Sequence, residues 1–330
     1  MKNNWNNKKK YKAVIIGAGK IAAGYDTPKS KAVLTHAHAL SRNPRVDLVG
    51  ISDVDSVRGT AEARKWKTTY WVDVDTMFTE VNPDIIVVAT PTETHKDLLL
   101  KAFKAQPKVI IVEKPVVNEK SEMQSIRLAQ VESKVPVIVN FRRRFDRTVA
   151  EVQSGLLKGT YGKVLSANAL YSKGILHNGS HLIDLVRYFF GEMTMGKMSF
   201  VVHDFPEGAP SLGGVATFER CPQFYFMAGD ERSFYVFELS ILTEKYRIRF
   251  TDEGRKLTVE AVVNDKIYPD DKVLGPAKVK KTHLAESMVR MVEHAVCVAD
   301  GIDVSFSSLE DALKTQETCY KLLASCKKNI

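Results

Sequence analysis

The chain has 330 residues, of which 44% are hydrophobic and 26% charged, and its mean hydropathy is −0.17. This composition is ordinary for a globular protein and excludes a disordered chain, a collagen-like repeat and a membrane protein, because no apolar run approaches the roughly 20 residues of a membrane span. The net charge is +9, and at roughly 150 residues per domain the length predicts two domains.

The N-terminal twelve residues carry five of the nine excess positive charges and no acid. They also lack an apolar signal-peptide segment, so we predict a disordered basic tail at residues 1–12 and no secretory signal. The remaining chain carries only +4, which does not favour a nucleic-acid partner. The four cysteines form no C-x-x-C pair, as expected of reduced thiols in a cytoplasmic protein: Cys221, Cys297, Cys319 and Cys326.

Residues 13–139 alternate short branched apolar runs with helical stretches. The runs are 13–16, 48–51, 85–89, 109–112 and 137–139, and helices are expected at 56–65, 95–104 and 119–132. Continuous apolar runs are typical of parallel strands that are covered by helices on both faces. The alternation therefore predicts a doubly wound parallel sheet with right-handed crossovers.

After residue 141 the pattern changes to aromatic and β-branched strands between residues 197 and 263, separated by turn signals such as Ala228-Gly229-Asp230. Helices are expected at 148–157, 179–190, 283–299 and 308–327. The overall fold class is therefore α/β, with a parallel-sheet domain at 13–140. Residues 141–330 are expected to form an α+β domain with an open, mainly antiparallel sheet of meander type, whose last helix can pack back on the first domain.

A glycine-rich turn follows the first predicted strand, with the pattern G-x-G-x-x-A from Gly17 through Gly19, Lys20 and Ile21 to Ala22. The first glycine permits the tight turn, and the second lets the backbone approach a pyrophosphate. Asp53 ends the second strand, where a carboxylate binds ribose hydroxyls and repels a 2′-phosphate, so NAD is favoured over NADP. Its spacing from the turn is long, which predicts an inserted loop at residues 24–34, and a helix then resumes at Thr35-His36.

Two histidines on that helix, His36 and His38, are two positions apart and face different sides, so no metal site is expected there. We expect His36 to contact substrate.

Polar residues follow the next three predicted strands, where the carboxyl ends of parallel strands meet a cofactor crevice. The candidates are Thr90, Pro91 and His95 after the third strand, Glu113 and Lys114 after the fourth, and Asn140 after the fifth. A lysine beside the nicotinamide can stabilise a developing alkoxide. The basic run of Arg142, Arg143 and Arg144 is either a solvated surface or a site for a phosphate or carboxylate.

The segment His177-Asn178-Gly179-Ser180-His181 opens a predicted helix and supplies the second group of candidates. A histidine is the usual base near neutral pH, and His177 lies one turn before His181. The H-x-x-x-H spacing also suits zinc, but no third ligand is nearby, so no metal is expected.

Together, the glycine turn, Asp53, Thr90-Pro91, Glu113-Lys114-Pro115, Asn140–Arg144 and Gly179–Asp184 resemble the glucose–fructose oxidoreductase/inositol dehydrogenase (Gfo/Idh/MocA) family, in its order and over nearly the whole chain. The resemblance implies an NAD-binding Rossmann domain and a second α/β domain for substrate binding and oligomerisation. It implies that Lys114 assists hydride transfer, that His181 is the acid/base and that Glu113 helps to hold the cofactor. Where many members have an aspartate four residues before the histidine, this chain has His177.

The His-Asn-Gly-Ser-His segment resembles members that oxidise nucleotide-linked sugars. That resemblance implies oxidation of C3 of a UDP-N-acetylglucosamine-type sugar to a ketone, feeding amino-sugar synthesis for surface polysaccharide or lipid A, with Arg142–Arg144 and Asn178 on the substrate side. The alternatives are a free polyol or inositol dehydrogenase and a non-catalytic sensor of NAD and sugar. A cytoplasmic homo-oligomer, dimer or tetramer, is expected, without nucleic-acid or membrane partners.

Overall fold

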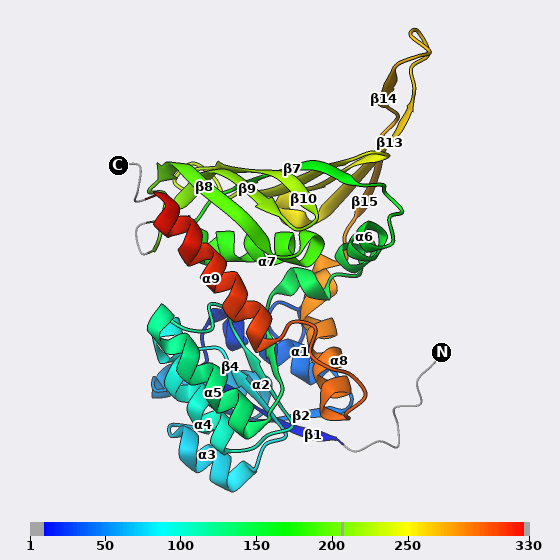
Figure 1. Ribbon diagram of the computed structural model, residues 1–330. Coiled ribbons are helices and arrows are strands. Elements are labelled where there is room, and N and C mark those ends of the chain that lie inside the picture. The colour runs from blue at the N-terminus through cyan, green and yellow to red at the C-terminus, as the bar shows by residue number, and fades with distance from the viewer. Residues whose placement is uncertain (1–9, 206–207, 327–330) are drawn as a thin grey trace. The chain divides into compact units, whose positions relative to one another are not determined.

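A computed structural model describes residues 10–205 and 208–326, which form two compact units (Figure 1). Unit 1 runs to Phe145 and includes Ala285–Leu313, whereas unit 2 comprises Asp146–Leu284 and the chain from Lys314 onward. The first strand begins at Tyr11, so the last two residues of the predicted basic tail belong to a strand. Residues 1–9 of that tail lie outside the described residues.

Unit 1 contains a six-stranded parallel sheet in the order β3-β2-β1-β4-β5-β6. Its strands are β1 (Tyr11–Ile16), β2 (Val46–Ser52), β3 (Thr69–Trp71), β4 (Ile85–Val88), β5 (Val109–Val112) and β6 (Val137–Val139). Every residue of β4, β5 and β6 is buried, which is the physical reason that these strands read as unbroken apolar runs. The predicted doubly wound parallel sheet is confirmed.

The helices of unit 1 are α1 (His36–Arg42), α2 (Ser56–Trp66), α3 (Val74–Val81), α4 (His95–Lys104), α5 (Met123–Ser133) and α8 (Ser287–Ala299). Helix α8 comes from far down the chain, and its apolar side chains join the core beneath the sheet: Met288, Met291, Val292, Ala295 and Val296. Sequence reasoning missed β3 and α3, because a three-residue, half-exposed edge strand and an eight-residue helix carry little periodic signal.

Unit 2 contains a nine-stranded sheet in the order β14-β13-β12-β11-β7-β10-β9-β8, with β15 also paired to β13. Its strands are β7 (Val164–Tyr171), β8 (Met193–Val202), β9 (Ser211–Phe218), β10 (Cys221–Ala228), β11 (Phe237–Thr243), β12 (Tyr246–Thr251), β13 (Lys256–Asn264), β14 (Lys272–Leu274) and β15 (Lys278–Lys281).

The expected α+β domain with a mainly antiparallel sheet is confirmed, but a simple meander is wrong. Strand β7 lies between β10 and β11, pairing in parallel with β10 and antiparallel with β11. The chain forms β7 first and then passes through helix α7 (Gly179–Phe190), and the later strands β10 and β11 add to the two edges of β7.

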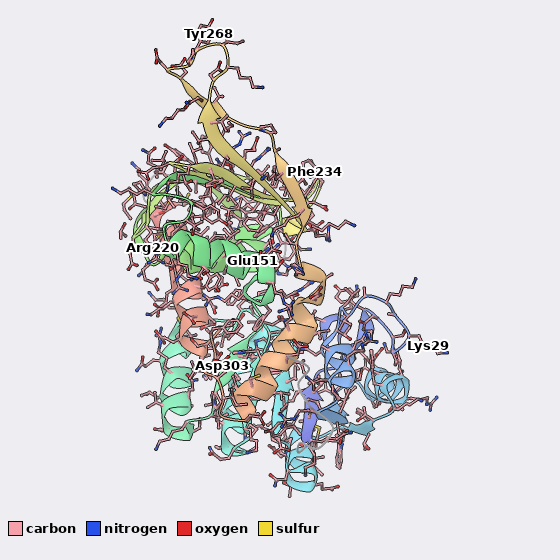
Figure 2. All side chains as sticks on the ribbon, turned by 90° about the vertical axis from the view of Figure 1, so that its right-hand side faces the viewer. Lys29, Glu151, Arg220, Phe234, Tyr268 and Asp303 are labelled. Atoms are coloured by element: carbon pink, nitrogen blue, oxygen red, sulfur yellow. The ribbon has the colours of Figure 1, made fainter. Side chains whose placement is uncertain are left out.

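Helices α6 (Arg147–Leu157), α7 and the end of α9 (Leu309–Cys326) supply the helical side of the unit 2 core, which is built on phenylalanines such as Phe189, Phe190 and Phe224. Among the described residues no helix covers the opposite face of the sheet, and Phe200, Tyr225 and Met227 are exposed there (Figure 1). The β13–β14 hairpin continues beyond the sheet, with Tyr268 at its tip (Figures 1 and 2).

Candidate functional site

The carboxyl edge of the unit 1 sheet collects the residues that were predicted to bind a cofactor. Strand β1 is followed by Gly17, β2 by Asp53, β4 by Thr90, β5 by Glu113 and Lys114, and β6 by Asn140. Because β1 and β4 are neighbours although they are not consecutive, the strand order reverses at this point, which is where open α/β sheets bind ligands.

The glycine turn has the shape that a dinucleotide requires. Gly17 has a φ of +98°, and a Cβ there would lie 2.5 Å from the carbonyl oxygen of Ala89, so only glycine fits. Around Gly19 a Cβ would meet nothing within 4 Å, which leaves open space over the backbone. The residues present therefore fit a pyrophosphate group on this turn.

The chain after Gly19 does not enter a full helix at once. Lys20–Gly24 forms a single π-helical turn, and helix α1 starts only at His36, capped by the Thr35 side chain, which accepts from the His38 amide. The inserted loop predicted between them is confirmed, and Lys29 extends from it into solvent (Figure 2).

Asp53 is buried beside this turn and is already engaged by donors. Its carboxylate accepts from the Ala18 amide at 2.6 Å, from the Asp55 amide at 2.8 Å and from Arg58 at 2.7 and 3.1 Å. Burial alone would raise the pKa of Asp53, but the Arg58 guanidinium and the two backbone amides outweigh burial and lower it. Asp53 is thus a buried, ionised hydrogen-bond acceptor beside the glycine turn, next to the Arg58 guanidinium.

His95 links the loops that follow β4 and β5 through hydrogen bonds. Its ring nitrogens lie 2.9 Å from the carbonyl oxygen of Thr90 and 2.8 Å from that of Pro115, and only 1% of the residue is exposed. Burial lowers the pKa of His95, against the effect of these carbonyls. In this structure His95 therefore supports the loops after β4 and β5.

Glu113 is held by two buried side chains, one of which sequence reasoning assigned to the substrate. His36 Nε2 lies 2.8 Å and Asn140 Nδ2 lies 2.6 Å from the same oxygen, Oε1 of Glu113. Burial would raise the pKa of Glu113, but the hydrogen bonds from His36 and Asn140 and the charges of His36 and Lys114 lower it. The contact between His36 and Glu113 joins residues 77 positions apart and has no local sequence signal.

His38 faces the other way, as the helical spacing predicts. Its Nδ1 lies 2.8 Å from Asp26 Oδ2, and Asp26 also accepts from the Leu34 amide and the Thr35 hydroxyl. This second buried histidine–carboxylate pair anchors both ends of the inserted loop to helix α1.

Of the three arginines after β6, Arg142 and Arg144 contact other residues of unit 1. Arg144 donates to the carbonyl oxygen of Phe306 at 2.8 Å and lies 3.5 Å from Asp311, and Arg142 Nε lies 3.4 Å from Ser287 Oγ. Arg143 and Arg144 are buried. The run is therefore largely integrated into the fold of unit 1.

In unit 2 the predicted histidines lie where a short π-helical turn, Gly174–Asn178, leads into α7. His177 is exposed and packs against Phe205 with ring centroids 5.1 Å apart, whereas His181 is half-buried. Asn178 is buried, donates to the carbonyl oxygen of Ser172 at 2.9 Å and accepts from the Tyr235 hydroxyl at 2.9 Å. The structure thus uses Asn178 to fix the start of α7.

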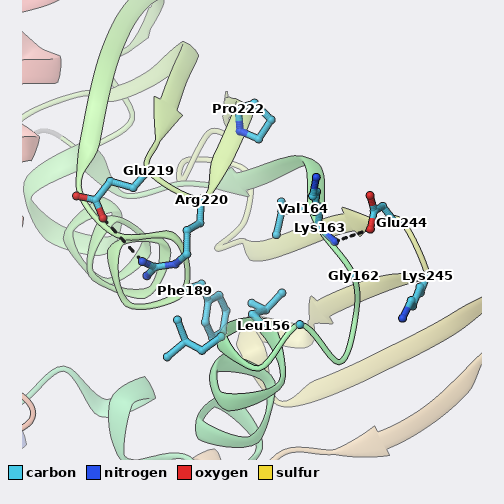
Figure 3. Close-up of a pocket in the computed structure, with 12 residues that line it drawn as sticks. Leu156, Gly162, Lys163, Val164, Phe189, Glu219, Arg220, Pro222, Glu244 and Lys245 are labelled. Carbon is cyan, nitrogen blue, oxygen red and sulfur yellow. Dashed lines mark hydrogen bonds and ion pairs between the residues drawn. The ribbon is translucent and has the colours of Figure 1, made fainter.

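A separate cavity of ≈580 Å³ in unit 2 lies at the other end of α7, around Leu156, Val164 and Phe189 (Figure 3). None of the predicted site residues lines it. Within residues 10–205 and 208–326, no group of three or more His, Cys, Asp or Glu side chains could hold a metal ion. In the same ranges no helix combines the length and hydropathy of a membrane span.

Comparison with known proteins agrees with this geometry. Residues 11–141 match the Gfo/Idh/MocA family, described as an oxidoreductase family with an NAD-binding Rossmann fold. Inositol 2-dehydrogenase of Rhizobium meliloti is 27% identical over 150 residues, covering 46% of this chain and 42% of that protein. The NAD(+)-dependent scyllo-inositol 2-dehydrogenase of Bacillus subtilis is 29% identical over 168 residues, covering 45% and 47%. The matches thus span less than half the length of these relatives.

Among solved structures, the WlbA dehydrogenase from Bordetella pertussis, in complex with NADH and UDP-GlcNAcA, has a TM-score of 0.75 at 14% identity and covers 98% of both chains. This likeness concerns the fold, and it extends over both units. The match to the Gfo/Idh/MocA oxidoreductase family concerns residues 11–141, which form the NAD-binding Rossmann fold of unit 1.

Proposed function

We propose that this protein is an NAD-dependent dehydrogenase that oxidises a ring hydroxyl of a sugar or cyclitol to a ketone. The observation that carries the proposal is the set of residues at one edge of the Rossmann sheet: the open glycine turn, buried Asp53, and the Glu113-Lys114 pair after β5. The matches to inositol dehydrogenases support the class of substrate.

Within this proposal, the backbone from Gly17 to Ile21 holds the pyrophosphate and Asp53 accepts from the adenosine ribose hydroxyls. Thr90 and Pro91 flank the nicotinamide end, and Glu113 accepts a hydrogen bond from that half of the cofactor. When bound, NAD⁺ supplies the acceptor for a hydride from the substrate carbon.

The chain's own residues manage the proton and the charge on oxygen. Lys114 donates a hydrogen bond to the reacting hydroxyl and stabilises the negative charge that develops on its oxygen. His181 accepts the hydroxyl proton, which contributes ~10²–10⁴-fold as general base catalysis. His177, exposed and one turn before His181, passes that proton to solvent in place of the aspartate that many family members have.

The finer proposal is a nucleotide-linked sugar, with oxidation at C3 of a UDP-N-acetylglucosamine-type ring. Its support is the His177–His181 segment and the fold shared with WlbA, whose structure holds UDP-GlcNAcA. The alternative substrate is a free polyol. The contacts of Arg144 with Phe306 and Asp311 favour this alternative, because a guanidinium that makes them is not available to bind a diphosphate.

We also propose a homo-oligomer formed through the uncovered face of the unit 2 sheet. That face exposes Phe200, Tyr225 and Met227, and an assembly would bury their apolar surface away from water. Light scattering of the purified protein tests this proposal, and a monomer at all concentrations would contradict it.

The test of function is a screen for NADH absorbance with NAD⁺ and one substrate at a time: myo-inositol, scyllo-inositol, UDP-N-acetylglucosamine and its uronate. The matched control is the Lys114→Ala variant, which should bind NADH but turn over slowly. Turnover of sugar nucleotides supports the finer proposal, and turnover of free polyols alone refutes it. Cofactor binding without turnover of any sugar or polyol would indicate a sensor and overturn the enzymatic proposal.

A further inference from the structure

We infer that His36 is a positioning residue, which holds the Glu113 carboxylate in the orientation that receives the nicotinamide half of the cofactor. The inference rests on the proposed function, because it concerns how Glu113 meets NAD. It differs from the sequence-based expectation, in which His36 contacts substrate.

The burial of the two side chains separates their roles. The His36 side chain is 0% exposed, whereas the Glu113 side chain keeps 12% of its surface. A ring with no exposed surface cannot touch a ligand in this conformation, so His36 acts through Glu113, its partner at 2.8 Å.

The hydrogen bonds to Glu113 select one carboxylate oxygen. His36 Nε2 and Asn140 Nδ2 are both hydrogen-bonded to Oε1 of Glu113. They come from two different elements of unit 1, helix α1 and the end of β6. Among the described residues Oε2 of Glu113 has no hydrogen-bond partner. Two donors on Oε1 therefore fix the rotation of the carboxylate and leave Oε2 to accept from a ligand.

The lowered pKa of Glu113 agrees with this arrangement, because an ionised carboxylate is an acceptor only. Its ligand must then present an N–H or O–H group, which the carboxamide and the ribose of a nicotinamide nucleotide both do. The Asn140 amide is itself backed by Met288 of α8, with its Nδ2 3.5 Å from the sulfur.

The geometry of the His36 ring also indicates the variants to use. Nδ1 of His36 is buried without a hydrogen-bond partner among the described residues, so only Nε2 carries a contact. The amide nitrogen of glutamine takes a position close to Nε2, and that of asparagine lies close to Nδ1. His36→Gln therefore keeps the donor to Glu113, and His36→Asn removes it at nearly the same polarity.

His38 provides a matched control on the same helix. It is equally buried, at 1%, and has a carboxylate partner at the same 2.8 Å, but this partner is Asp26 rather than Glu113. Its contact uses Nδ1, so His38→Gln breaks that pair without touching Glu113.

The experiment measures the NADH dissociation constant by fluorescence and the melting temperature for the full-length wild type and each variant. We expect His36→Asn to weaken NADH binding about tenfold, the equivalent of ~1.4 kcal/mol, and His36→Gln to stay within about twofold of wild type. We expect His38→Gln to lower the melting temperature like His36→Asn and to keep wild-type affinity. In a Glu113→Gln background, His36→Asn should add little further loss.

Equal affinity of His36→Asn and wild type, or an equal loss in His38→Gln, would overturn the inference. If His36→Asn does not fold, His36→Gln decides by comparison with Glu113→Gln. Affinity within about twofold of wild type in His36→Gln, with a clear loss in Glu113→Gln, supports the inference, and a loss in His36→Gln as large as that in Glu113→Gln overturns it. Failure of the cofactor-binding part of the proposed function, on which this inference rests, is recognised separately, because the wild-type protein itself would then bind no NADH.

Discussion

The pair formed by Asp53 and Arg58 predicts a switch in cofactor preference when Asp53 is changed to Asn. The two side chains meet at 2.7 and 3.1 Å, and Asp53 keeps only 5% of its side-chain surface whereas Arg58 keeps 47%. In the proposed function the wild-type carboxylate accepts from ribose hydroxyls and repels a 2′-phosphate. In Asp53→Asn the Arg58 guanidinium loses the carboxylate that it pairs with and becomes available to a 2′-phosphate at that position.

The magnitude follows from these exposures. Losing hydrogen bonds to a charged acceptor costs ~1.5–3 kcal/mol, so NAD⁺ should lose at least about tenfold in kcat/KM. Two unit charges at 4 Å interact by ~1 kcal/mol in water and ~4 kcal/mol at an effective dielectric of 20, and the half-exposed Arg58 belongs near the lower value. Because ~1 kcal/mol corresponds to about fivefold, NADP⁺ should gain about fivefold, for a combined shift of roughly 50-fold in the kcat/KM ratio.

The assay is the ratio of kcat/KM for NAD⁺ and NADP⁺ on the substrate found in the screen, repeated at increasing ionic strength. The NADP⁺ gain should shrink with salt, since the Debye length falls to ~10 Å at 0.1 M. Asp55→Asn is the control, because Asp55 also lies near Arg58, at 3.5 Å, but caps α2 and asparagine caps equally well. An unchanged ratio in Asp53→Asn, or the same shift in Asp55→Asn, would refute the reasoning.

Three further outcomes are expected. Lys114→Ala should lower kcat by about 10²-fold or more in steady-state assays while NADH binding changes little, and near-normal kcat would exclude the proposed role of Lys114. Burial lowers the pKa of His95 below 6.5, so that on acidification His95 is protonated in the unfolded chain before it is protonated in the folded protein. The free energy of unfolding should therefore fall as the pH drops below about 6.5. In urea titrations at several pH values, His95→Gln should show a weaker dependence of this free energy on pH. Gly17→Ala should lower the melting temperature strongly, since its Cβ would meet Ala89, whereas Gly19→Ala should fold normally and weaken NADH binding; equal melting losses would contradict this.

The parts of the fold that were read correctly from sequence depend on local patterns. Strands β5 and β6 have the predicted bounds, as do helices α4 and α7, because covered strands are apolar throughout and helices show their period. Strand ends then identify the polar residues that follow them, which is how Asp53, Glu113 and Lys114 were found.

The pairing of strands in unit 2 was beyond that reasoning. Strand β7 has the same alternating burial as its neighbours, and nothing in its residues says that it separates β10 from β11. A sheet's order depends on which strands meet after the chain crosses through α7, and this information is spread over residues far apart.

The amino-acid sequence by itself therefore determined the two sheet types, the glycine turn and the polar residues at the strand ends, because each of these depends on neighbours within a few positions. Only the tertiary structure decided the contacts that act on those residues: His36 on Glu113, Arg58 and Ala18 on Asp53, and α8 in the core of unit 1. These contacts are decided by packing, which brings together side chains of common types, and common types carry no signal of their partner until the chain has folded.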